Sequence, residues 1–372
     1  MTVTAVSAFV RPYDYWYDRY QTFYRTSLRL RCAAAGASFD VEPITRFPQV
    51  LKPLRDVRDR YLTRAPGTWT TSVVDRLAFA LEGPVRTPSS SYHNAIGQYV
   101  IRTTDGALCR VCIDTADYPE LRSDELLSWS DLYFKANLWP SRPYPPNALP
   151  IVNGDPLILD RIPTLRSYRK MEKSTDVCFV VRVWGGRDGI EGIEHNLRLL
   201  EAVNRARCSK VVIAYLVTGD TGAISDRLRK SEIRSTTRPI RPGALWRLMG
   251  SSRLNIIRLG MHDCIPWRMA GTLAMGSGVV LDQTPLAAWP EPLRENVNFF
   301  NLSCGAGDTP ASDADYAAVP AKIEEWLSQP EQLEQMMSTN AAYFDRHVDP
   351  ERVGEAILSA VEAQAARPTS RR

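Results

Sequence analysis

The sequence predicts an α/β protein with two Rossmann-like, doubly wound domains that face each other across a cleft. Its length of 372 residues allows about two domains. From residue 175 to residue 282, apolar strand patterns alternate with helical patterns, as in parallel sheets joined by right-handed crossovers. A strand, helix, strand pattern opens the chain, and segment 140–156, with six prolines, separates the two regions. Domains are therefore expected at 1–156 and 157–349.

The first domain is expected to begin with a helix between two strands. A hairpin should follow within residues 97–114, because two β-rich runs flank Thr-Thr-Asp-Gly. The expected elements are strand 3–10, helix 13–32, strand 38–44, the hairpin, helix 123–129 and a strand within 131–139.

The second domain repeats strand and helix regularly and ends in helices without intervening strands. Prolines at three helix starts support the last assignments, since Pro suits the first helical turn. The expected elements are helix 157–173, a strand from 175, helix 194–207, strand 210–218, helix 224–231, strand 237–240, helix 242–251, strand 253–259, helix 266–275, strand 278–282 and helices 320–329, 330–344 and 350–366.

Composition excludes several classes of protein. The net charge of +4 comes from scattered residues, which does not indicate nucleic-acid binding. Seven cysteines do not predict a disulfide framework, and Cys109 and Cys112 lie in an expected strand where residues three apart face opposite sides. The start lacks a leader pattern and no window predicts a membrane span, so a reducing cytoplasm is the expected location.

The segment 254–283 is the most informative. It predicts a buried strand, a loop, a helix with Pro266 in its first turn, and another buried strand. Free amides at the helix start, together with Arg268, would favour a phosphate, whereas pairing of Arg268 with a carboxylate is the alternative. In the loop, His262 suits a phosphate or a sugar hydroxyl, and Asp263 suits sugar hydroxyls or helix capping.

The segment PWRMAGTLAMGSGVVLDQ resembles the C-terminal halves of GT-B glycosyltransferases, particularly the bacterial group 1 and exostosin-like kinds. The likeness extends over residues 175–366, with Arg268 at the family's Arg position and Gly276 at its downstream Gly. Gly271 stands where the family has a Glu that holds the ribose hydroxyls. A glycine within a helix costs about 1 kcal/mol against Ala, and close approach of a helix or a ligand would compensate.

The resemblance implies transfer of a sugar from a nucleotide-diphosphate sugar donor to an acceptor hydroxyl, without a bound metal or other cofactor. It implies donor binding by the second domain, acceptor binding by the first, and a last helix, 350–366, that crosses back to the first domain. The acceptor would be a small molecule or a glycan. Candidate donor-binding residues are Arg182, Trp184, Gly185, Arg187, Arg238, Pro239, Ile240, Gly260, Met261, His262, Asp263, Pro266, Trp267, Arg268 and Thr272.

An inverting transfer needs a general base, whereas a retaining transfer does not. Asp114 and Asp117 follow a strand end, where they are either a base and its neighbour or turn formers. His93 is the other candidate base, and Lys135, one of few lysines, is a candidate for binding a charged acceptor. The sequence DAD at 313–315 is expected in a loop and is not a convincing metal motif.

Two rival functions share this fold. No GxGxxG after a strand, GxxxxGK[ST] or GxSxG occurs, which removes the usual support for dehydrogenase, P-loop and serine hydrolase chemistry. One rival is a nucleotide-sugar epimerase. The other is a catalytically inactive nucleotide-sugar-binding subunit, suggested by Gly271 in place of Glu.

Overall fold

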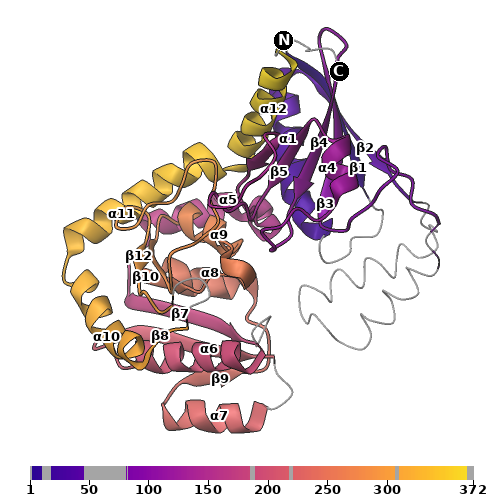
Figure 1. Ribbon diagram of the computed structural model, residues 1–372. Helices are drawn as coiled ribbons and strands as arrows, with labels where there is room; N and C mark the ends of the chain where they lie inside the picture. The colour runs from indigo at the N-terminus through magenta and orange to yellow at the C-terminus, as the bar shows by residue number, and fades with distance from the viewer. Residues whose placement is uncertain are drawn as a thin grey trace. The chain divides into compact units, whose positions relative to one another are not determined.

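The computed structural model describes residues 2–10, 18–45, 81, 83–184, 189–217, 221–305 and 310–366 (Figure 1). The chain forms two compact units. The first unit contains Met1–Leu159 and His347–Arg372, and the second contains Asp160–Arg346. No helix in the described ranges is long and apolar enough to span a membrane.

The first unit contains a six-stranded sheet in the order β2-β1-β3-β4-β5-β6. All its strands run in one direction except β3, which is antiparallel to both of its neighbours. The exception is the hairpin expected from the sequence, whose turn contains Gly106 at φ +80°. The sheet is therefore not wholly parallel. Its strands are β1 (Val3–Val10), β2 (Ser38–Pro43), β3 (Ile96–Thr103), β4 (Leu108–Asp114), β5 (Leu132–Lys135) and β6 (Ala148–Pro150).

Two long helices from opposite ends of the chain pack together in the first unit. Helix α1 (Asp18–Ala35) contacts the last helix, α12 (Pro350–Ala365), and Figure 1 shows them side by side. The start of β1 is also attached to α12, because Val3 N donates to Glu362 Oε1 at 3.2 Å. A short helix, α4 (Asp124–Trp129), packs Leu126 with Ile96 and Tyr133 of the sheet.

The contact between α1 and α12 depends on Gly354. A Cβ atom at this position would lie 2.2 Å from the Ser27 backbone oxygen. We expect Gly354→Ala to lower the free energy of unfolding by about 1–3 kcal/mol, because the helices must separate. Urea denaturation measures this change. Gly243→Ala is the control: a Cβ there meets no atom within 4 Å, so that variant should be unchanged or slightly more stable.

The second unit contains a six-stranded, fully parallel sheet in the order β12-β11-β10-β7-β8-β9. The crossover helices expected between its strands are present. Its strands are β7 (Thr175–Val183), β8 (Lys210–Leu216), β9 (Arg234–Thr236), β10 (Ser252–Ile257), β11 (Gly278–Leu281) and β12 (Phe300–Asn301). Its helices are α5 (Ile162–Ser167), α6 (Gly189–Asn204), α7 (Thr221–Lys230), α8 (Pro242–Gly250), α9 (Arg268–Ala274), α10 (Asp313–Leu327) and α11 (Pro330–Tyr343).

Three expected element boundaries in this unit are wrong. Strand β9 ends at Thr236, so residues 237–240 form no strand, and the helix expected over 157–173 is divided into short 3₁₀ and α segments. Helix α10 begins at Asp313 rather than at Pro320, because Ser312 and Asp315 form a capping box. The DAD sequence is thus the first turn of a helix rather than a loop. Pro320 lies inside α10, and the Arg205 guanidinium donates to the Tyr316 carbonyl that its missing N–H leaves unbonded.

Candidate nucleotide-sugar site

The strand order of the second unit changes direction at β7. Strands β8 and β9 continue to one side of β7, while β10, β11 and β12 lie on the other. The register between β7 and β10 ends at Cys178 and Asn255, although β7 continues along β8 as far as Val183. The carboxyl ends of β7 and β10 therefore diverge, and open α/β sheets bind ligands at such a point.

At the carboxyl end of β7, Arg182 and Trp184 are both exposed to solvent. The Arg182 guanidinium carbon lies 5.0 Å from the centre of the Trp184 ring, and Trp184 is 41% exposed. An arginine stacked on an aromatic ring keeps its N–H groups available in the plane of the guanidinium. This pair suits an anionic, planar ligand. The neighbouring candidates Gly185 and Arg187 lie outside the described residues.

The loop after β10 is a tight turn. Gly260 N donates to the Cys264 carbonyl at 3.0 Å, and a Cβ at Gly260 would lie 2.4 Å from Cys264 Sγ. His262 and Asp263 both have left-handed backbones, at φ +55° and +51°. Gln283 Nε2 donates to Asp263 Oδ1. The capping role expected for Asp263 is wrong, because α9 begins without a side-chain cap. Met261 belongs to this turn.

Helix α9 differs from the phosphate-binding helix expected from the sequence. It has seven residues, and the amides of Met269 and Ala270 donate to the carbonyls of Pro266 and Trp267. The expectation of free amides is wrong at these two positions. Arg268 Nη1 donates to the Val180 carbonyl at 2.6 Å, on β7 beyond its last pairing with β10.

Thr272 and Gly271 both lie on the buried face of α9. Thr272 is fully buried and its hydroxyl donates to the Arg268 carbonyl, so the helix backbone already uses this group. Gly271 is buried too, and the first turn contains no carboxylate. The second unit therefore has no acidic side chain where the resembling family places its ribose-binding Glu.

The residues expected to contact the base form a surface turn between β9 and α8. Thr236 Oγ1 accepts from Arg238 N at 3.0 Å and donates to the Arg238 carbonyl at 3.1 Å. Arg238 is exposed, whereas Pro239 and Ile240 are half-buried. Their role in base binding stays a prediction.

A cluster that the sequence reasoning missed lies at the carboxyl ends of β10 and β11. Arg258 Nη1 donates to Asn196 Oδ1 at 3.1 Å, and Arg258 Nε lies 3.7 Å from Asp282 Oδ2. His195 contacts the same Asp282 oxygen and also Tyr316. The sequence offers only a weak signal for this cluster, namely that Arg258 and Asp282 each follow a buried strand. Their helical partners come from positions 62 and 87 residues earlier, which no local pattern indicates.

In the first unit, Asp114 and Lys135 form a buried ion pair. Both side chains are completely inaccessible, and Lys135 Nζ lies 3.1 Å from Asp114 Oδ2. The Tyr133 hydroxyl and the Ala116 amide also donate to this carboxylate, each at 2.8 Å. The pairing follows from register, since Asp114 and Lys135 are partners on β4 and β5. The expectation of an accessible base at Asp114 and an acceptor-binding ammonium at Lys135 is therefore wrong.

The other two candidate bases differ in environment. Asp117 is half-buried, and its carbonyl accepts from Asn137 Nδ2. His93 Nδ1 accepts from the Ala95 amide at 3.2 Å, so the proton of the neutral ring is on Nε2. Burial lowers the pKa of His93, and the nearby Asp114 partly opposes this shift. His93 therefore offers a hydrogen-bond donor rather than a free lone pair.

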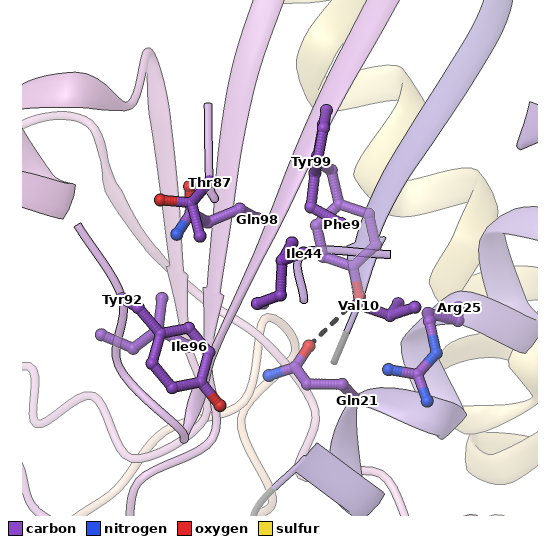
Figure 2. A pocket seen from close by; sticks show the side chains of 11 residues that line it. Phe9, Val10, Gln21, Arg25, Ile44, Thr87, Tyr92, Ile96, Gln98 and Tyr99 are labelled. Atoms are coloured by element: carbon purple, nitrogen blue, oxygen red, sulfur yellow. Dashed lines mark hydrogen bonds between the residues drawn. The ribbon is translucent and has the colours of Figure 1, made fainter. Parts of the chain in front are cut away.

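A small cavity lies beside the carboxyl end of β1 (Figure 2). Its volume is about 10 Å³, close to what one water molecule requires. Tyr99 Oη donates to Gln21 Oε1 at 3.1 Å, as the dashed line in Figure 2 marks. Gln98 Nε2 donates to the Ser91 carbonyl at 2.8 Å, while its buried Oε1 has no hydrogen-bond partner among the described residues.

The described ranges contain no group of three or more His, Cys, Asp or Glu side chains that could hold a metal ion. All seven cysteines are free thiols. Burial raises the pKa of Cys109 to about 12 and raises that of Cys112 further, so neither is a ready thiolate.

No protein-family model and no curated protein matches the chain. Solved structures do. A glycosyltransferase from Rickettsia africae ESF-5 is 9% identical, with a TM-score of 0.51 over 99% of this chain and 100% of that one. Anabaena Alr3699/HepE, solved in complex with UDP and glucose, is 12% identical, with a TM-score of 0.47 over 97% of this chain and 100% of that one. The chain thus has a GT-B glycosyltransferase-like fold.

Proposed function

We propose that the protein is a glycosyltransferase that moves a sugar from a nucleotide-diphosphate sugar to an acceptor hydroxyl. The second unit binds the nucleotide-sugar donor. The first unit binds the acceptor, a small molecule or a glycan. Fold alone does not define a reaction, so the proposal depends on the chemistry at the carboxyl edge of the second sheet.

One observation carries the proposal. Two arginines lie at the carboxyl ends of the two diverging strands, Arg182 on β7 and Arg258 directly after β10. Arg182 is exposed and Arg258 is 26% exposed, so both are accessible to a ligand. Arginine binds phosphate oxygens through paired N–H groups, which matches a diphosphate. The exposed Trp184 offers an apolar surface beside Arg182.

Calorimetry with a panel of nucleoside diphosphates tests donor binding. We expect the nucleoside diphosphate with the preferred base to bind with a dissociation constant at least tenfold below those of the others. Hydrogen bonds between a protein and a base distinguish one base from another by this factor or more. Failure of every member to bind folded protein would contradict the proposal. Incubation with EDTA tests the proposed independence from metal ions, and full activity should remain.

A non-catalytic nucleotide-sugar-binding subunit is the second candidate. Two observations favour it: no carboxylate stands in the first turn of α9, and the carboxylate of Asp114 is engaged by Lys135. Nucleotide binding with no consumption of any nucleotide sugar, with or without acceptors, would favour this function. Conversion of the donor sugar without an acceptor would instead indicate an epimerase.

A further inference from the structure

Arg258 is held on two sides by the protein. Its Nη1 donates to Asn196 Oδ1 at 3.1 Å, and its Nε lies 3.7 Å from Asp282 Oδ2. Asn196 is fully buried, and its Nδ2 reaches the Trp184 carbonyl at 3.5 Å. Within the described part of the chain, no acceptor contacts Arg258 Nη2. One edge of the guanidinium is therefore fixed and another is open.

Asp282 is the anion that fixes Arg258, and its side chain is only 3% exposed. Its Oδ1 accepts from the Leu259 amide at 2.9 Å, which joins β11 to the end of β10. Its Oδ2 lies 3.4 Å from His195 Nε2. Because these two contacts occupy the carboxylate, Asp282 attracts Arg258 without closing on it as a bidentate pair.

The tautomer of the neutral His195 ring follows from its two neighbours. An ionised carboxylate only accepts hydrogen bonds, so the proton of the neutral ring must be on Nε2. Nδ1 then accepts from the Tyr316 hydroxyl, 2.6 Å away. Burial raises the pKa of Tyr316 to about 12, which keeps this hydroxyl protonated. Both hydrogen bonds are therefore donated in the same direction: Tyr316 donates to His195, and His195 donates to Asp282.

We propose that Tyr316, His195 and Asp282 form a positioning chain that keeps the open edge of Arg258 directed at a phosphate of the nucleotide-sugar donor. The proposal rests on the proposed function for the identity of this anion. Without the His195 N–H, Asp282 Oδ2 would close on Arg258 from 3.7 Å and draw the guanidinium away from the ligand. Tyr316 and His195 touch no ligand in this proposal and act through Asp282.

The measurement is the ratio of two dissociation constants, that of a nucleoside over that of its diphosphate. This phosphate contribution does not change when a variant only reduces the fraction of folded protein. We expect Arg258→Ala to lower the ratio about ten- to a hundredfold, the effect of losing a charged hydrogen bond. His195→Leu should lower it by about fivefold and Tyr316→Phe by about threefold, since weaker positioning costs less than losing the contact.

Matched variants separate positioning from packing. His195→Gln keeps an N–H near the Nε2 position and should retain most of the ratio. Arg198→Ala should retain most of it, because Arg198 stacks on the Tyr316 ring at 4.1 Å and pairs with Asp313 but makes no hydrogen bond to Tyr316, His195 or Asp282. Inorganic pyrophosphate is the second probe and should follow the same order of variants.

The outcomes are distinct. An unchanged ratio in Arg258→Ala or His195→Leu, alongside a reduced ratio in Arg182→Ala, would overturn the positioning chain and leave the proposed function intact. Equal losses in His195→Gln and His195→Leu would also overturn it. If pyrophosphate binding depends on Arg258 and His195 while no nucleoside diphosphate binds, the positioning chain is supported and the proposed donor is wrong. Failure of every probe to bind native protein would refute both.

Discussion

Lys135→Met is expected to lower the free energy of unfolding by about 3–5 kcal/mol, the usual effect of breaking a buried ion pair. The variant leaves the Asp114 carboxylate in a site where both side chains are completely inaccessible. The Tyr133 hydroxyl and the Ala116 amide still donate to Asp114, but neither carries a compensating charge. Urea denaturation followed by circular dichroism measures the change.

The control for this prediction removes both charges. Lys135→Met combined with Asp114→Leu should recover most of the lost stability, since an apolar pair of similar volume often replaces a buried ion pair without loss. Arg110→Ala is a second control, because its pair with Asp131 joins the same two strands at the surface and should change stability by about 1 kcal/mol or less. A Lys135→Met variant as stable as the native protein would show that the pair contributes nothing.

Arg182→Ala is expected to weaken binding of a nucleoside diphosphate by about ten- to a hundredfold, through loss of a charged hydrogen bond to phosphate. Thermal stability should hardly change, because Arg182 is exposed and its side chain contacts only the Trp184 ring among the described residues. Calorimetry against the preferred diphosphate measures the affinity. Because unfolding is not involved, any loss belongs to the ligand contact.

Arg229→Ala is the matched control for Arg182. It removes one arginine and one positive charge from the same unit, but from the exposed end of α7, where Arg229 pairs with Asp226. Binding in this variant should equal that of the native protein. Equal affinity in Arg182→Ala and native protein would exclude Arg182 from the nucleotide site. Equal losses in both variants would indicate a diffuse effect of net charge instead.

The alternation of strands and helices in the second unit was readable from sequence because its parallel strands are buried, apolar and short. Each crossover helix has its own apolar pattern, and right-handed connections leave few topologies. Sequence patterns place a boundary wrongly where two local signals compete. Pro320 favours a helix start, but the capping box at Ser312 and Asp315 decides where α10 begins. Arg205, distant in sequence, then provides the donor that Pro320 cannot.

The candidate site was only partly predictable. Arg182 and Trp184 lie at the end of a strand that the sequence marks clearly, and both are exposed, while their role in donor binding stays a prediction. Lys135 and Asp114 have the residue types expected for a binding group and a base, yet strand register pairs them in the interior. Arg258 has no local motif, and its significance arises only once Asn196 and Asp282 are placed beside it.

The sequence by itself determined the α/β class, the hairpin that reverses β3, and the region of the second sheet where a ligand is expected. These features depend on the period of apolar residues and on turn chemistry, which act over a few residues. Tertiary structure decided which charged side chains pair with each other in the interior and which remain accessible to a ligand. That choice depends on the register between β4 and β5 and on the packing of α6 against α10, which bring together residues separated by 21 to 121 positions.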